Sequence, residues 1–338
     1  MGFFRMNTSA RKSSGSSRRG EPVLRFLVFL LAALFLAAPV SAEQKVFMSG
    51  GTEPFPEDAE LLTVRFAGLM GGDCMLVTLG DKSMFVDVGT VTSTKEIREV
   101  TDAAGIDHAD IFFNSHPHSD HIGGFIPLLD SGFSIGSLVT FFPHDYMGYC
   151  VLQIRSLKAA EEHGVEIVDM KTEDTFSLGS AELTAWRIPD HRIMRGIMGP
   201  NDLSAILMLR YGDCSILFAG DIEDYGQRIL TEEYGPLMKA DILKYPHHGI
   251  TACETAFIES VSPEAVFITN TPHRTASAQR QLKYHGISKM SFTSWGMITL
   301  QTDGHKWIAS QEIRPVRRSQ FRQYRKDHSW IQFPADLP

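Results

Sequence analysis

Cysteine is scarce in this chain of 338 residues, with four cysteines that lie far apart in the sequence. None of them forms a C-x-x-C pair, which argues against a zinc site built from thiolates. Cys74 and Cys214 stand in apolar, strand-like runs, where a cysteine most often serves as a small buried hydrophobic residue. Export would permit disulfides, but sequence alone does not give their connectivity. The chemistry of this protein therefore has to come from other side chains.

The apolar run at residues 26–38 is too short to span a bilayer comfortably, because a transmembrane helix needs about 20 apolar residues. Basic residues precede this run and Val40-Ser41-Ala42 follows it, which is the pattern of a secretory signal peptide over residues 1–42. We therefore expect cleavage after Ala42 and export to the periplasm or the extracellular space. An uncleaved N-terminal anchor is the alternative, and it would be the only contact with a membrane.

Positive charge is in deficit, with 32 Lys and Arg against 40 Asp and Glu and a formal net charge of −8. Loss of residues 1–42 removes six basic residues and one acidic residue, which takes the formal net charge to −13. Such a surface repels polyanions in general. A nucleic-acid or phosphodiester substrate would need local positive charge, including that of bound metal ions. The tail at residues 311–338 mixes arginine with aromatic residues and could supply positive charge of this kind. A solvated extension is the alternative interpretation of the tail.

The rest of the composition is that of a globular protein, with 43% hydrophobic and 10% aromatic residues. After a lead-in at residues 43–60, strand-like and helical patterns alternate over residues 61–310, with a turn-rich connection at 171–179. This order favours an α/β domain in which two mixed sheets face each other with helices on their outer faces.

The densest chemical signal is the stretch SHPHSDHIGG at residues 115–124. Four side chains that can bind metal ions, His116, His118, Asp120 and His121, stand within six positions. They follow the apolar run 111–113, which reads as a short buried strand. Zinc favours imidazole nitrogen and carboxylate oxygen, and a hydrolytic site leaves one position open for water. The sequence therefore predicts a metal site in a loop at the end of a strand.

This stretch resembles the H-x-H-x-D-H motif of the metallo-β-lactamase superfamily. The resemblance covers roughly residues 60–310 and implies an αββα sandwich that carries a two-metal hydrolase site. It also implies that His116 and His118 bind one metal and that Asp120 and His121 bind the other. A histidine at position 118, where di-iron members tend to carry an acidic residue, favours zinc and hydrolysis.

The resemblance assigns further residues at the ends of later strands. It implies that His191 completes the first metal site, that Asp221 bridges the two metals, and that Asp87 supports the metal-binding loop from behind. One histidine of the pair His247 and His248 is the last ligand of the second metal. We expect His248 to be that ligand and His247 to be a second donor that faces the substrate, although the two roles could be exchanged.

Three other stretches resemble the extracytoplasmic hydrolase domain of competence proteins, which act in DNA uptake: Gly71-Gly72-Asp73-Cys74, Asn201-Asp202-Leu203-Ser204 and Tyr245-Pro246-His247-His248-Gly249. The turn at Leu69-Met70-Gly71 and residue Ile250 depart from that pattern. The resemblance implies a secreted hydrolase in which two zinc ions activate a water molecule, with Asp120 and His247 as catalytic residues. Manganese or iron could replace zinc.

The substrate is then a small-molecule or polymeric ester, and we expect a phosphodiester. Hydrolysis of lactam, lactone or thioester bonds at the same site is one alternative. A non-catalytic binding module of the same fold is another. The oligomeric state stays open.

Overall fold

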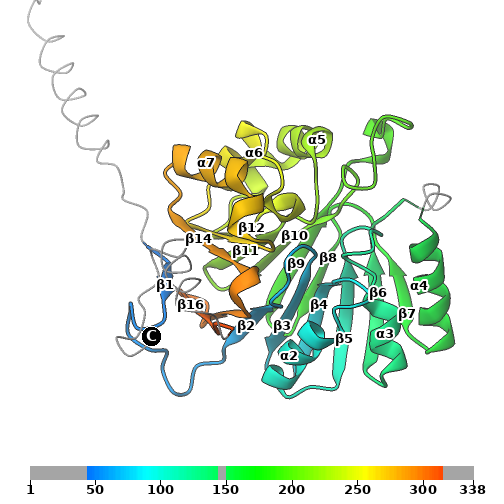
Figure 1. The fold of residues 1–338 in the computed structure, drawn as a ribbon, viewed down its shortest axis with the longest axis horizontal. Coiled ribbons are helices and arrows are strands. Elements are labelled where there is room, and N and C mark those ends of the chain that lie inside the picture. The colour runs from blue at the N-terminus through cyan, green and yellow to red at the C-terminus, as the bar shows by residue number, and fades with distance from the viewer. Residues whose placement is uncertain (1–43, 144–149, 315–338) are drawn as a thin grey trace, which may run out of the picture. The chain divides into compact units, whose positions relative to one another are not determined.

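The computed structural model describes residues 44–143 and 150–314, where a nine-stranded and a seven-stranded sheet are stacked on each other (Figure 1). The predicted signal peptide and most of the predicted C-terminal tail lie outside these residues. No helix among the described residues is long and apolar enough to cross a membrane.

The nine-stranded sheet has the order β1-β16-β15-β2-β3-β4-β5-β6-β7. Its strands are β1 (Val46–Met48), β2 (Leu62–Phe66), β3 (Cys74–Leu79), β4 (Lys82–Val88), β5 (His108–Asn114), β6 (Ser134–Thr140), β7 (Glu166–Asp169), β15 (Ile298–Thr302) and β16 (Trp307–Gln311). Strands β4 to β7 run parallel to one another, whereas β2 and β15 pair antiparallel with their neighbours.

The seven-stranded sheet has the order β14-β13-β12-β11-β10-β9-β8. Its strands are β8 (Thr175–Leu178), β9 (Ala181–Trp186), β10 (Ile206–Tyr211), β11 (Cys214–Phe218), β12 (Ile242–Lys244), β13 (Ala265–Ile268) and β14 (Lys289–Phe292). Strands β11 to β14 run parallel. Each sheet therefore has a group of parallel strands whose carboxyl ends meet at one edge, which is where α/β proteins commonly bind ligands.

Helices cover the outer face of each sheet (Figure 1). The helices are α2 (Thr94–Ala104), α3 (Phe125–Asp130), α4 (Val151–Glu162), α5 (Asp224–Tyr234), α6 (Thr255–Val261) and α7 (Ala276–Tyr284). Short 3-10 turns are η2 (Asp190–Arg192), η3 (Gly235–Leu237), η4 (Pro246–Gly249), η5 (Pro272–Arg274) and η6 (Thr293–Trp295). The helix α2 ends where predicted, because Gly105 adopts the left-handed conformation (φ 67°) that closes a helix.

Three apolar clusters hold these layers together. The largest lies between the two sheets and includes Phe66 from β2 and Phe218 from β11, whose ring centroids are 6.4 Å apart. The second packs the seven-stranded sheet against α5, α6 and α7, and the third packs the nine-stranded sheet against α2, α3 and α4. Strands covered on both faces read as continuous apolar runs, as β13 does with all four residues apolar and buried.

Two short strands lie in segments that the sequence assigned to a lead-in and to a turn-rich connection. Strand β1 lies in the segment predicted as a lead-in, and it pairs in parallel with β16, with Val46 opposite Trp307. Strand β8 lies in the connection predicted as turn-rich, and it pairs antiparallel with β9. Both strands have only three or four residues, and runs this short carry too little periodicity to be recognised without the partner strand.

Candidate metal centre

The loop that follows β5 carries the densest group of chemical side chains and is fixed by its backbone. Val88 N–H donates to the His121 carbonyl over 2.7 Å, and Asp73 N–H donates to the Asp120 carbonyl over 3.0 Å. The helix that ends this loop begins after Gly124, where a Cβ atom would lie 2.1 Å from the Val88 carbonyl oxygen. Only glycine permits this close approach, and the histidines are therefore held against the ends of β3 and β4.

Asp87 supports the loop from behind, as predicted for it. One carboxylate oxygen accepts hydrogen bonds from Asn114 Nδ2 (3.0 Å) and Ser115 N–H (2.9 Å), and the other accepts from Ser115 Oγ (2.6 Å). That second oxygen also lies 2.7 Å from His121 Nδ1. A carboxylate can only accept, so His121 Nδ1 carries a proton, and Nε2 is the ring atom that can bind a metal ion in place of a second proton. Asp87 has φ 52°, a conformation uncommon outside glycine that often marks a functional site.

The same serine sets the tautomer of His116. The hydroxyl proton of Ser115 is donated to Asp87, so Ser115 Oγ can only accept from His116 Nδ1, which lies 3.1 Å away. The Nε2 atom of His116 then points its lone pair at His118 Nδ1 over 3.0 Å. Burial, reinforced by the positive charge of His121, lowers the pKa of His116 well below its usual value. Both His116 and His118 are therefore neutral imidazoles, the form that binds metal ions.

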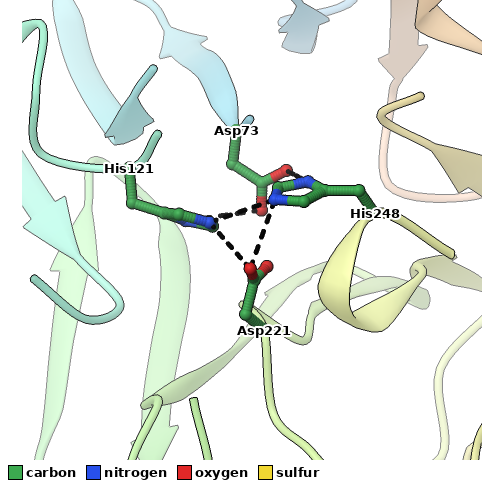
Figure 2. A group of neighbouring side chains, drawn as sticks. All are labelled: Asp73, His121, Asp221 and His248. Carbon is green, nitrogen blue, oxygen red and sulfur yellow. Dashed lines mark hydrogen bonds and ion pairs between the residues drawn. The ribbon is translucent and has the colours of Figure 1, made fainter. Parts of the chain in front are cut away.

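A second group of donors converges on His248, which follows β12 (Figure 2). The His248 Nε2 atom lies 3.2 Å from Asp221 Oδ2, 3.3 Å from Asp120 Oδ2 and 3.3 Å from His121 Nε2. The backbone of His248 has φ 49°, and this left-handed conformation turns the ring towards the other strand ends. Segments that are far apart along the chain therefore contribute to one group.

Asp221 lies between the two pairs of histidines, after β11. Its Oδ2 atom is 3.1 Å from His121 Nε2, and its Oδ1 atom is buried without a hydrogen-bond partner among the described residues. Burial would raise the pKa of Asp221, but the charges of His121 and His248 hold it well below its usual value. In turn, Asp221 and Asp87 overcome the effect of burial on His121 and raise its pKa to about 10.

These residues fit a pair of metal ions. Donor atoms bound to one tetrahedral zinc at 2.0–2.1 Å lie about 3.3 Å apart. The two closest nitrogen pairs, His121 Nε2 with His248 Nε2 and His116 Nε2 with His118 Nδ1, are separated by 3.3 Å and 3.0 Å. Either a proton or a metal ion can bridge two imidazole nitrogens at this distance. Four imidazoles and the carboxylates of Asp120 and Asp221 form a donor set suited to zinc.

Asp73 belongs to the same group, although no role was assigned to its side chain from the sequence. Single donor atoms of Asp73, His121, Asp221 and His248 all lie within 4.8 Å of one another. Asp73 Oδ1 is 3.2 Å from His248 Nδ1, and Asp73 Oδ2 is 3.8 Å from His121 Nδ1 (Figure 2). Burial would raise the pKa of Asp73, but Lys244 and His248 keep it below its usual value. The signal available in the sequence was an acidic residue that follows two glycines and directly precedes a buried strand.

His247 lies beside this group and is partly exposed. Its Nδ1 atom is 2.9 Å from Glu223 Oε1, and its Nε2 atom is 4.0 Å from Asp221 Oδ2. Asn201 Nδ2 donates to the same Glu223 oxygen over 3.1 Å and lies 3.5 Å from His247 Nε2. His248 therefore approaches the other donors more closely than His247 does, and its role as the ligand of this pair stays a prediction.

His191 lies apart from the other predicted ligands. It is exposed on η2 and lines a cavity of about 740 Å³ with Arg187 and Pro189. None of the hydrogen bonds or ion pairs that join the donors among residues 44–143 and 150–314 involves His191. The role of His191 as a ligand stays a prediction.

No protein-family model matches the chain. The chain is 26% identical over 277 residues to the competence protein ComA of Neisseria gonorrhoeae, which covers 79% of this chain and 36% of that protein. It is 27% identical over 186 residues to the ComE operon protein 3 of Bacillus subtilis, which covers 54% of this chain and 22% of that protein. The chain thus spans only about a third or less of the length of these relatives.

Solved structures with a similar fold include two that cover most of the chain. The metallo-β-lactamase fold protein YhfI of Bacillus subtilis matches with a TM-score of 0.50 and 14% identity, over 72% of this chain and 100% of that one. A variant of the β-hydroxylase CmlA matches with a TM-score of 0.50 and 15% identity, over 74% of this chain and 55% of that one. At this level of identity the likeness shows the fold alone, and the predicted αββα sandwich is confirmed.

Proposed function

We propose that this chain, which has the metallo-β-lactamase fold and shares sequence with competence proteins, is an exported metal-dependent hydrolase that uses two zinc ions to cleave a phosphodiester. The fold and the candidate metal site are the basis of this proposal. Zinc is favoured because the donors are four imidazoles and two carboxylates. Manganese or iron could occupy the same site.

One observation carries the proposal. The hydrogen bonds around Asp87 orient His116 Nε2 and His121 Nε2 towards the other ligand candidates, and each lies 3.0–3.3 Å from another imidazole nitrogen, the spacing of two ligand atoms on one zinc ion. We assign His116 and His118 to one metal, Asp120, His121 and His248 to the other, and Asp221 to both.

When bound, the metal ions would supply Lewis-acid activation of water and neutralise charge on the phosphoryl group. The side chains of the chain have separate tasks. Asp120, whose side chain is 36% exposed, borders the opening to solvent, where its free carboxylate oxygen can accept a proton from the attacking water. His247 approaches Asp221 from the partly exposed side, and its Nε2 atom can donate a proton to the leaving oxygen. Glu223 Oε1 lies 2.9 Å from His247 Nδ1, an ion-pair contact on the side of the ring away from Nε2.

Two arguments support a phosphodiester over a lactam, lactone or thioester. The first is the likeness to two proteins named for competence, together with the three stretches of sequence that resemble DNA-uptake hydrolases. The second is electrostatic, because two divalent cations at a cleft in an acidic surface provide the positive charge that an anionic ester requires. Hydrolysis of an uncharged lactam, lactone or thioester bond stays the alternative.

The test combines metal content with turnover. Purified protein should contain two zinc ions per chain and hydrolyse bis(p-nitrophenyl) phosphate faster than a chromogenic cephalosporin. Asp120→Ala should lower phosphodiester turnover at least about 100-fold, the lower end of general acid–base contributions. Asp102→Ala, which removes an exposed carboxylate from α2, serves as the matched control and should keep full activity.

Each other outcome has a distinct meaning. Rapid cephalosporin cleavage with inert phosphodiesters would refute the substrate class. If the protein contained no metal and showed no turnover that depends on Asp120, the alternative of a non-catalytic binding module would remain. Export is tested separately, by N-terminal sequencing of the mature protein, where we expect Glu43 as the first residue.

A further inference from the structure

Lys244 is a fully buried lysine at the carboxyl end of β12, beside the metal-binding residues. Its Nζ atom forms an ion pair with Asp73 Oδ2, donates to the Gly220 carbonyl over 2.8 Å and lies 3.7 Å from Asp221 Oδ1. Lysine is almost never fully buried unless it is paired. The sequence analysis gave no role to Lys244 or to the side chain of Asp73.

The contacts of Asp73 determine which nitrogen of His248 carries the proton. Thr269 Oγ1 donates its hydrogen to Asp73 Oδ1 over 2.7 Å, so its oxygen can only accept from His248 Nδ1, which lies 2.9 Å away. Asp73 Oδ1 itself is a second acceptor, 3.2 Å from the same nitrogen. The N–H of Gly72 also lies 3.3 Å from Nδ1, but two acceptors, one of them charged, outweigh this single donor. His248 Nδ1 therefore carries a proton, and Nε2 is the ring atom that a metal ion can bind.

We propose that Asp73 and Lys244 form a positioning pair for the second metal site. Asp73 holds the ring and the tautomer of His248 from the side opposite to the metal, and Lys244 balances the charge of Asp73 so that its carboxylate stays there. The inference rests only on the metal-binding part of the proposed function. It does not depend on the substrate.

The geometry separates this role from that of a direct ligand. Asp120 and Asp221 approach His248 at Nε2, whereas Asp73 approaches it at Nδ1. Both oxygens of Asp73 are already engaged, one by Thr269 and the other by Lys244. The arrangement repeats that of Asp87 behind His121, so each of the two histidines is backed by its own carboxylate. Such outer partners raise the basicity of a ligating imidazole and fix its orientation.

The experiment measures zinc affinity of the full chain by competition with a chromogenic chelator. We expect Asp73→Asn to lower the affinity for Zn²⁺ about 10- to 100-fold, the usual effect of removing such a partner. At saturating Co²⁺ the visible absorption spectrum of Asp73→Asn should match that of the wild type, because the set of ligands is unchanged. If Asp73 had only a structural role, Asp73→Asn would not combine a reduced affinity for Zn²⁺ with an unchanged Co²⁺ spectrum.

A second pair of variants guards against loss of folding. Asp73→Asn removes the closer ion-pair partner of the buried ammonium of Lys244 and leaves it only Asp221 Oδ1 at 3.7 Å, which is destabilising. The double variant Asp73→Asn with Lys244→Met removes both charges. Each of the two single variants, Asp73→Asn and Lys244→Met, should lower the melting temperature of the metal-free protein. We expect the double variant to reverse most of this decrease. It should keep the reduced affinity for Zn²⁺, because His248 still lacks its carboxylate.

The matched control lies at the other end of the same strand. Asp241 precedes β12, accepts from Ser215 N–H over 2.7 Å and pairs with Lys45 Nζ at 3.8 Å. Asp241→Asn should change the melting temperature without changing the affinity for Zn²⁺.

Three results would overturn the proposal. Unchanged zinc affinity in Asp73→Asn would remove the positioning role while leaving the metal site intact. An altered Co²⁺ spectrum at saturation would make Asp73 a ligand. A wild-type chain that binds no metal would end both this inference and the proposed function.

Discussion

Replacement of Asp87 by asparagine tests whether the tautomers of the histidines are set from behind. The carboxylate accepts four contacts, two at each oxygen. An amide has one oxygen, so two of these acceptor positions become donors that face Ser115 Oγ and His121 Nδ1. Each lost charge-assisted hydrogen bond is worth about 1.5–3 kcal/mol, and we expect the free energy of unfolding to fall by roughly 3–6 kcal/mol. Asparagine tolerates the positive φ of this position, so the change adds no backbone strain.

The same substitution should weaken metal binding. With an amide N–H opposite Nδ1, His121 gains by carrying its proton on Nε2, the atom that faces Asp221 and His248. We expect the affinity for Zn²⁺ to fall about 10- to 100-fold, which corresponds to about 1.4–2.7 kcal/mol. Chelator competition measures the affinity for Zn²⁺, and urea denaturation measures the free energy of unfolding. The ¹⁵N chemical shifts of the histidine rings report the tautomer of His121.

Asp110→Asn is the matched control for Asp87→Asn. Asp110 lies on β5, accepts from Ser83 N–H over 2.9 Å and pairs with Lys82 at 3.4 Å, away from the histidines. The Asp110→Asn variant should lose some stability and keep the metal affinity of the wild type. If Asp87→Asn bound zinc as tightly as the wild type, the tautomer argument for His116 and His121 would be refuted.

Three further predictions follow from the structure. Gly124→Ala would place a Cβ atom 2.1 Å from the Val88 carbonyl oxygen, so we expect a loss of about 1–3 kcal/mol in the free energy of unfolding, measured with urea; an unchanged midpoint would contradict this. His191→Ala should lower the metal content by one ion per chain in elemental analysis if His191 is the ligand predicted from the sequence, and unchanged metal content in this variant of an exposed residue would refute that role. The four cysteines are free and buried, and burial raises the pKa of Cys214 to about 11 and of Cys253 to about 12, so they stay protonated at mildly alkaline pH. Ellman's reagent should therefore label none of them before guanidinium is added, and rapid labelling of the native protein would count against the structure.

Much of the site could be predicted because its signals are local. His116, His118, Asp120 and His121 stand within one short loop, and a loop after a buried strand keeps its side chains together whatever the rest of the chain does. Asp221 and His248 could be proposed because each follows an apolar strand, and the carboxyl ends of parallel strands lie at one edge of a sheet. The fold class could be predicted from the alternation of strands and helices for the same reason.

The choice between His247 and His248 was open in the sequence. Both residues have positive φ on the same turn, and two neighbouring histidines give no periodic signal that would separate them. The structure separates them by distance, because His248 Nε2 is 3.2 Å from Asp221 Oδ2 and His247 Nε2 is 4.0 Å from it.

Tertiary structure alone decided the parts that depend on distant contacts. Asp73 reads as a turn residue until Thr269, 196 positions later, and Lys244 are seen beside it. Strand β1 has only three residues and exists because β16 offers a free edge. The sequence by itself determined which chemical groups stand at the strand ends, since composition and periodicity are local properties. Only folding decided which of these groups are buried against each other, because burial, charge compensation and the choice of tautomer depend on neighbours from other parts of the chain.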